Sequence, residues 1–324
     1  MHIVVTGGAG FLGTLLTRRL LDLADAGDVD LQRITSLDLA PSRVEDARVA
    51  SVVGAITDPT IVAEALGDGV GAVYHLAAEL SGGSEADFDA AMSVNVDGTR
   101  TLLEAARRAG SQGRPVRFVF TSSLAVFGGQ MPDVVPSHWA TQPDSTYGAT
   151  KAIGEILVNE YTRKGYVDGL VCRLPTISVR PGLPNSAASS FASGIIREPL
   201  SGVASQVPVP HDTRMWLSSP RTVVTNLAHA LTLDSASLPR WRVLDLPGIT
   251  VTVGEMLDSL ERVGGAEARA LVTDAPDDRV AAIVTSWPGA FDVTTATALG
   301  FAQDTSFDDA VAQYRDDVAL PPAR

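Results

Sequence analysis

Three side chains near the middle of the chain have the types and the spacing needed to move a proton to or from an alcohol. Tyr147 and Lys151 are four residues apart in an expected helix, Tyr147–Lys164, so both lie on one helix face. A tyrosine with its ordinary pKa of about 10 is a poor base, but a lysine ammonium one turn away favours the phenolate. Ser123 follows a separate expected strand and can hold the same substrate oxygen. We predict that these three residues are catalytic, with Tyr147 as the base, and that Ser123 and Tyr147 also bind substrate.

Residues 1–23 have the strand, glycine turn and helix that are typical of a dinucleotide site. Ile3-Val4-Val5 is an uninterrupted apolar run, as expected for a strand buried on both faces of a parallel sheet. Gly7, Gly10 and Gly13 follow with the spacing G-x-x-G-x-x-G before a helical pattern. The three glycines permit a sharp turn, the approach of a pyrophosphate and close helix packing, respectively. The expected cofactor contacts in this segment are Gly7, Gly10, Phe11, Leu12 and Gly13.

Two acids follow at positions that could contact the adenosine half of the cofactor. Asp38 ends the second expected strand, Arg33–Leu37, where a carboxylate can accept both ribose hydroxyls and repels a 2′-phosphate. This position favours NAD over NADP, and the alternative is an acid in a surface loop. Asp58 precedes an expected helix, Pro59–Leu66, and could either cap that helix or contact the adenine amino group.

Strands and helices alternate as far as Leu174, and this pattern is typical of an α/β fold with a Rossmann-type doubly wound parallel sheet. We expect a dinucleotide-binding domain at 1–174, to which 221–247 return, and a smaller C-terminal substrate-binding lobe at 175–220 and 248–324. His75 and Arg173 are interpreted as packed structural residues. The remaining expected strands are Ala50–Ile56, Ala72–Leu76, Arg117–Thr121, Val167–Leu174 and Trp241–Leu246. The remaining expected helices are Asp87–Arg108, Ser189–Arg197, Arg221–Leu233, one that begins with a Thr252/Glu255 capping box, and Phe307–Val318, with a loop at Glu79–Ser84.

The composition excludes several classes of protein and site. The 324 residues carry a net charge of −13, which argues against a nucleic-acid-binding surface. The single Cys172 excludes an internal disulfide and fits a reducing compartment. No apolar run reaches the roughly 18 residues needed to span a bilayer, and a core strand at Ile3 leaves no room for a cleavable signal peptide. The five histidines lack metal-ligand spacing, so we expect a cytoplasmic protein without a nucleic-acid partner, a membrane partner or a metal.

The segments TGGAGFLG, HLAA, NVDGT, FTSSLAVFG and YGATK occur in an order that resembles the extended short-chain dehydrogenase/reductase family, of the NAD-dependent epimerase/dehydratase type. The resemblance covers nearly the whole chain and implies NAD as cofactor. It also implies the catalytic roles already given to Ser123, Tyr147 and Lys151, and a hydrogen bond from Lys151 to the nicotinamide ribose. The further expected cofactor contacts are Leu76, Ala77, Ala78, Asn95, Ser122, Tyr147, Lys151, Pro175 and Ile177.

The substrate region departs from the sugar-nucleotide enzymes of that family. Arg214 matches their arginine, but the acidic pair that follows it in those enzymes is missing, which argues against a nucleotide sugar. The segments RLPTISVRPG, LSSPRT, LPGITVTVGEM and SWPGAFD instead resemble the D-erythronate dehydrogenase subgroup. That resemblance implies NAD-dependent oxidation of D-erythronate, a four-carbon sugar acid, at C2 to the 2-oxo acid.

A sugar acid needs a cation for its carboxylate and polar partners for its hydroxyls. Arginine binds a carboxylate through two parallel hydrogen bonds, and Arg214 is our first choice, followed by Arg180 and Arg197. A helix N-cap is the alternative role for Ser189 and Ser190. The expected partners of the hydroxyls are Ser81, Thr176, Ser189 and Ser190.

Two other functions and one assembly are consistent with the same residues. The fold also serves a sugar or nucleotide-sugar epimerase, or a dehydrogenase of another sugar acid or uronate. A non-catalytic nucleotide sensor is the third reading, although a sensor can dispense with the Tyr147–Lys151 pair that this chain has. We expect a homodimer, because in the family that the chain resembles the helices corresponding to Asp87–Arg108 and Tyr147–Lys164 pair across a two-fold axis.

Overall fold

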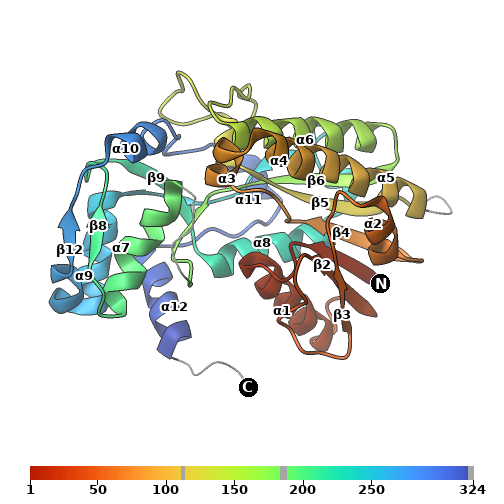
Figure 1. Cartoon of the computed structure of the whole chain (residues 1–324), viewed down its shortest axis with the longest axis horizontal. Helices are drawn as coiled ribbons and strands as arrows, with labels where there is room; N and C mark the ends of the chain where they lie inside the picture. The colour runs from red at the N-terminus through yellow and green to blue at the C-terminus, as the bar shows by residue number, and fades with distance from the viewer. Residues whose placement is uncertain (111–113, 183–187, 320–324) are drawn as a thin grey trace. The chain divides into compact units, whose positions relative to one another are not determined.

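A computed structural model describes residues 1–110, 114–182 and 188–319 and contains a seven-stranded sheet in the order β10-β6-β5-β4-β1-β2-β3 (Figure 1). β1 pairs in parallel with β2 and β4, β2 pairs in parallel with β3, and β4 with β5. Every residue of β1 is buried, as the uninterrupted apolar run predicts. The strand order reverses beside β1, so the predicted doubly wound α/β fold is confirmed. The strands are β1 (His2–Thr6), β2 (Arg33–Asp38), β3 (Val49–Val53), β4 (Val70–His75), β5 (Val116–Ser123), β6 (Val167–Leu174) and β10 (Val243–Asp245).

Helices cover both faces of this sheet (Figure 1). α2 (Pro59–Leu66), α5 (Thr99–Ala109) and α6 (Thr146–Arg163) share one buried apolar cluster with β1, β4, β5 and β6. α1 (Phe11–Asp25) and α8 (Pro220–Thr232) lie on the other side, where the Tyr74 hydroxyl donates to Leu227 O of α8 at 3.0 Å. The strand expected at Trp241–Leu246 is shorter in the structure: β10 covers Val243–Asp245 and lies at the edge of the sheet, beside β6.

A second group of elements has a core of its own. β9 (Arg214–Ser218) pairs in parallel with β7 (Thr176–Ile177) and antiparallel with β11 (Ile249–Thr252). The predicted capping box is present at the start of the helix Val253–Ala270: Glu255 N donates to Thr252 Oγ1 at 3.1 Å, and Thr252 N donates to Glu255 Oε2 at 2.7 Å. The remaining elements here are α7 (Phe191–Leu200), β8 (Ser205–Val207), α9 (Val253–Ala270), β12 (Val272–Asp274), α10 (Asp278–Val284), α11 (Thr294–Ala298) and α12 (Phe307–Ala319).

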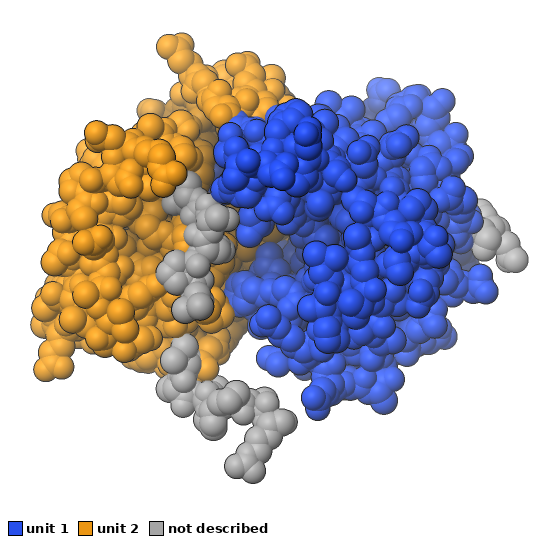
Figure 2. Space-filling view, in the orientation of Figure 1, with its two compact units in different colours: residues 1–126, 145–173, 224–244 blue, residues 127–144, 174–223, 245–324 orange. Residues whose placement is uncertain are grey.

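The chain divides into two compact units, which Figure 2 shows in different colours. Unit 1 comprises 1–126, 145–173 and 224–244, and unit 2 comprises 127–144, 174–223 and 245–324. The expected first domain, 1–174, includes 127–144, but in the structure this segment belongs to unit 2. Val135 N donates to Ala290 O at 3.0 Å, and the Phe127 and Phe291 ring centroids are 5.5 Å apart. These long-range contacts leave no local pattern in the sequence.

Three further expectations need correction. Glu79–Ser84 is not a loop throughout, because α3 (Ser81–Ala86) begins there and is closed by Ser84 N donating to Leu80 O at 2.8 Å. The expected helix Asp87–Arg108 is α4 (Phe88–Ala91), a π-helical segment at Met92–Gly98 and α5. The strand expected at Ala50–Ile56 ends at Val53, because Asp58 N donates to Ala55 O at 3.1 Å in a turn.

Candidate active site

The glycine turn between β1 and α1 has the geometry that a dinucleotide pyrophosphate needs. Gly7 has a φ of 69°, and a Cβ added there would lie 2.9 Å from Ala77 N. A Cβ on Gly13 would lie 2.2 Å from Gly7 O, so α1 packs against the turn only because this residue is glycine. Gly10 precedes α1 without a side-chain cap, which leaves first-turn N–H groups for an anion. The turn fits the predicted cofactor, with Phe11 and Leu12 in the first turn of α1.

Asp38 holds the glycine turn and retains capacity for a ligand. Asp38 Oδ2 accepts from Ala9 N at 3.0 Å, and Oδ1 accepts from Leu39 N at 2.6 Å. An ionised carboxylate has about four acceptor sites, so ribose hydroxyls can still bind. Asp58 caps α2 by accepting from Thr60 N at 2.8 Å, the first of the two roles considered for it. Its contact with adenine stays a prediction.

Ser123, Tyr147 and Lys151 all belong to unit 1. Ser123 ends β5 and Tyr147 lies in the first turn of α6, and both are half-buried. Lys151 is only 3% exposed, and its Nζ donates to Thr121 O at 2.9 Å. The same Nζ is 5.7 Å from the centroid of the Tyr147 ring, within the range of a cation–π contact. Burial lowers the pKa of Lys151 to about 8, against the opposing field of the Glu155 carboxylate, so Lys151 is charged at neutral pH.

A buried ion pair lies one turn further along α6, and its acidic residue, Glu155, was not among the expected functional residues. Glu155 Oε2 is 2.7 Å from Arg173 Nη2, Glu155 Oε1 accepts from Arg173 Nε at 2.8 Å, and both side chains are almost fully buried. Ser122 Oγ donates to Glu155 Oε1 at 2.6 Å, so this carboxylate links α6, β5 and β6. Arg173 is structural, as expected. The spacing of Glu155, four residues after Lys151 on one helix face, was the signal that could have found it.

Asn95 joins the segment after β4 to α6, the helix that carries Tyr147 and Lys151. Its Oδ1 accepts from Glu79 N at 2.8 Å, while its Nδ2 donates to Glu79 O at 3.1 Å and to Thr150 Oγ1 at 3.0 Å. Asn95 lies in the π-helical segment, a geometry that is frequent at functional sites. The side-chain amide thus binds protein groups, and its expected contact with the cofactor stays a prediction.

His75 is a packed histidine, as expected. Its Nδ1 is 2.9 Å from Thr6 Oγ1 and its Nε2 is 2.8 Å from Thr99 Oγ1. Burial, assisted by the charge of Lys151, lowers the pKa of His75 to about 3, so the ring is neutral and bonded on both sides. The predicted cofactor contacts Leu76, Ala77 and Ala78 follow it at the carboxyl end of β4 and are half-buried.

Unit 2 carries the predicted carboxylate-binding arginines. Arg214 at the start of β9 is exposed, and within the described part of the chain its guanidinium has no ion-pair or hydrogen-bond partner. Arg197 is 7% exposed and engaged, because Nη1 donates to Arg180 O at 2.9 Å and Nη2 is 2.5 Å from Glu198 Oε1. Arg214 is therefore the better available cation of these two, and Arg180 is half-buried.

The other predicted recognition residues are distributed over both units. Pro175 lies between β6 and β7, and Thr176 and Ile177 form β7. Ser189 and Ser190 lie in a 3₁₀ turn before α7, where Ser190 makes no capping bond to that helix. Ser81 is the first residue of α3 in unit 1.

Comparisons with known proteins agree on family and fold. A family model described as "NAD dependent epimerase/dehydratase family" matches residues 3–217. D-erythronate dehydrogenase of Cupriavidus necator is 50% identical over 99% of both chains, and that of Haemophilus influenzae is 44% identical over 97% of this chain and 98% of its own. The crystal structure of a nucleoside-diphosphate-sugar epimerase from Agrobacterium tumefaciens superposes with a TM-score of 0.91 at 38% identity, covering 98% of this chain and 94% of its own.

Two further findings concern metal sites and membrane-spanning helices. In residues 1–110, 114–182 and 188–319, no group of three His, Cys, Asp or Glu side chains could hold a metal ion. Within those same ranges, every helix is too short or too polar to cross a bilayer.

Proposed function

The chain belongs to the NAD-dependent epimerase/dehydratase family, and from this premise we propose that it oxidises D-erythronate at C2 to 2-dehydro-D-erythronate. The observation that carries the proposal is the full-length similarity to two D-erythronate dehydrogenases in a chain that keeps the Ser123, Tyr147 and Lys151 arrangement. The exposed Arg214 guanidinium supports an anionic substrate.

The chain's own residues supply the proton transfer. Tyr147 takes the proton of the C2 hydroxyl as general base, and Ser123 holds that oxygen through a hydrogen bond. Lys151 is fixed by Thr121 O and presents a positive charge beside the Tyr147 ring, which favours the phenolate. NAD, when bound by the glycine turn and Asp38, supplies the acceptor for the hydride that leaves C2.

The test is NADH absorbance with a panel of four- to six-carbon sugar acids and their epimers. Net NADH formation, greatest with D-erythronate, is expected. An epimerase regenerates its NAD and forms no net NADH, so the same assay separates the two reactions.

Tyr147→Phe tests the base directly. It removes only the ionisable oxygen, so kcat is expected to fall at least about a hundredfold while NAD binding survives. A Tyr147→Phe protein that binds NAD and turns over near the wild-type rate would contradict the mechanism.

We also propose a cytoplasmic homodimer that uses the helices of unit 1. Phe88 on α4 is 60% exposed and Ile156 on α6 is 59% exposed, which is unusual for large apolar side chains. A dimer with a two-fold axis beside α4 and α6 would bury both of these side chains in its interface. Light scattering is expected to give twice the monomer mass of 33.9 kDa at micromolar concentration, and a monomer would reject the proposal.

A further inference from the structure

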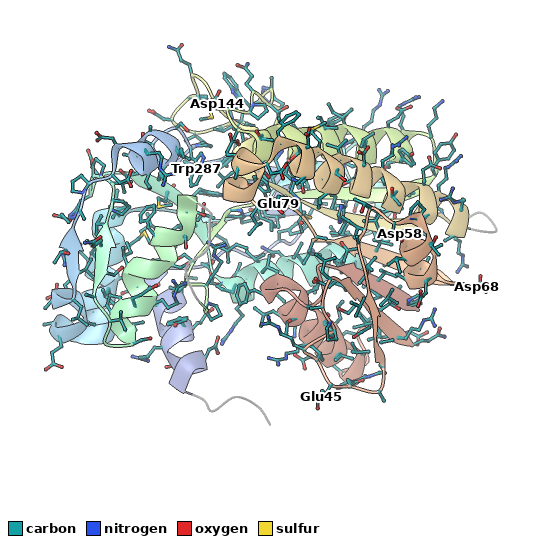
Figure 3. The ribbon with its side chains drawn as sticks, viewed as in Figure 1. Glu45, Asp58, Asp68, Glu79, Asp144 and Trp287 are labelled. Carbon is teal, nitrogen blue, oxygen red and sulfur yellow. The ribbon has the colours of Figure 1, made fainter. Side chains whose placement is uncertain are left out.

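Glu79 is a half-buried carboxylate that the mechanism above does not use. It follows β4, at the edge of the sheet where the adjacent β5 ends in Ser123, and it is labelled in Figure 3. Considering the described residues only, its two carboxylate oxygens have no hydrogen-bond or ion-pair partner. Carboxylate oxygens that no protein group occupies can accept hydrogen bonds from a ligand.

The backbone of Glu79 is fixed relative to the catalytic helix. One Asn95 side chain holds both the N–H and the C=O of Glu79, at 2.8 Å and 3.1 Å. The same amide donates to Thr150 Oγ1 at 3.0 Å, and Thr150 directly precedes Lys151. Glu79 is therefore held in register with the residues that act on the substrate's C2 oxygen, as a residue that reads the rest of the substrate must be.

The sequence also keeps space for this carboxylate. A Cβ added to Gly83 in α3 would lie 1.7 Å from Glu79 Oε1, so any other residue there would displace the carboxylate. The glycine at position 83 therefore leaves room for the Glu79 carboxylate in its present place.

We propose that Glu79 is a specificity-determining residue that accepts hydrogen bonds from the C3 and C4 hydroxyls of the sugar acid, an inference that rests on the proposed function. Two adjacent hydroxyls match the two oxygens of one carboxylate. The negative charge of Glu79 also repels the substrate's own carboxylate, so the substrate binds with its hydroxyl-bearing end toward Glu79. The residue thus selects for a polyol end and fixes the direction in which the acid lies.

The experiment compares two substrates on matched variants. kcat/KM is measured for D-erythronate and for 2-hydroxybutanoate of the same C2 configuration, which keeps the carboxylate and the reacting hydroxyl but lacks the other two. Glu79→Ala is expected to lower kcat/KM on D-erythronate about 10- to 150-fold, the range for hydrogen bonds to a charged group, and to leave 2-hydroxybutanoate nearly unchanged. Glu79→Gln keeps one accepting oxygen and is expected to restore part of the loss.

Two controls separate recognition from a structural role. Glu64→Ala, on the exposed side of α2, is expected to leave kcat/KM unchanged for both substrates. The NAD Kd of every variant is expected to match that of the wild type. If Glu79→Ala lowers kcat/KM equally for both acids, or does not lower it for D-erythronate, the assignment of Glu79 is wrong. If the wild-type protein forms no NADH with any sugar acid, the proposed function itself fails, and this is seen before the variants are compared.

Discussion

In unit 1, Lys151, Glu155 and Arg173 are each at most 5% exposed, and hydrogen bonds hold them to one another or to β5. In unit 2, Arg214 projects from the start of β9 with an exposed guanidinium. The predicted catalytic lysine and the buried ion pair next to it are thus placed before any ligand arrives. Arg214, the candidate cation for the substrate carboxylate, has its guanidinium available for a ligand. The difference predicts that substitutions in the first unit change stability as well as rate, whereas Arg214 changes binding alone.

The largest expected effect comes from breaking the buried ion pair. Arg173→Leu leaves the Glu155 carboxylate buried without its partner, so the free energy of unfolding is expected to fall by about 3–5 kcal/mol. Chemical denaturation measures this free energy of unfolding. The double variant Glu155→Leu/Arg173→Leu is expected to recover most of the lost free energy of unfolding. The control Arg163→Leu breaks the exposed pair with Glu160 and is expected to leave the free energy of unfolding almost unchanged. A stable Arg173→Leu protein would remove the contrast between the two units.

Lys151→Met is expected to stabilise the protein while it impairs function. The pKa of Lys151 is lowered from 10.5 to about 8 by burial, a difference that corresponds to about 3 kcal/mol. Below pH 8 the lysine is charged in both the folded and the unfolded state, so the full cost of burial is present. That cost fades as the pH rises from about 8 to 10.5, because the folded state loses its proton first.

The corresponding experiment follows unfolding of the cofactor-free protein at pH 7 and near pH 10.5. Lys151→Met is expected to be the more stable protein at pH 7, with an advantage that shrinks at high pH, and to bind NAD more weakly. A variant that is less stable than the wild type at pH 7 would mean that the bond to Thr121 O outweighs the burial of the charge.

Arg214→Ala tests the exposed side of the comparison. Loss of a charge-assisted contact is expected to cost about 1.5–3 kcal/mol in substrate binding, seen as a higher KM for D-erythronate with unchanged NAD affinity and stability. Arg221→Ala, which removes another exposed arginine of unit 2, is the matched control and is expected to leave KM unchanged. If KM does not change, the carboxylate binds to another cation, and Arg180 is the next to test.

The smallest expected effect concerns cofactor choice. The wild-type protein is expected to prefer NAD to NADP at least about tenfold in kcat/KM, or about 1.4 kcal/mol, because Asp38 repels a 2′-phosphate. Asp38→Ala is expected to narrow this ratio. Equal values of kcat/KM for NAD and NADP in the wild type would contradict the assignment of Asp38.

Local patterns in the sequence predicted the parts of the molecule whose causes are local. The glycine turn, the cap at Asp58 and the capping box at Thr252 each follow from residues within one or two turns of one another. The bounds of α2 and β6 agree with those expected, because a capping residue and an uninterrupted apolar run mark them.

The contacts that the sequence did not reveal join distant segments. Asn95 and Thr150 are 55 residues apart, and Glu155 and Arg173 are 18 residues apart. Such pairs produce no periodicity, so the π-helical segment around Asn95 and the pairing of Glu155 with Arg173 were not expected. The sequence shows only that Glu155 shares a helix face with Lys151. α3 was missed for a related reason: Gly82 and Gly83 are poor helix formers, and bonds from Ser84 to Leu80 O and Glu79 O close the turn.

The bond between Asp38 and Ala9 N limits any redesign of cofactor preference. A protein engineer who replaces Asp38 by a small residue, to admit the 2′-phosphate of NADP, also removes the acceptor that holds the backbone of the glycine turn. The turn would then have to be ordered at the expense of binding energy, and affinity for both cofactors would fall together. A substitution that retains an acceptor toward Ala9 N, such as Asp38→Asn or Asp38→Ser, paired with a new basic residue nearby, is the better starting point.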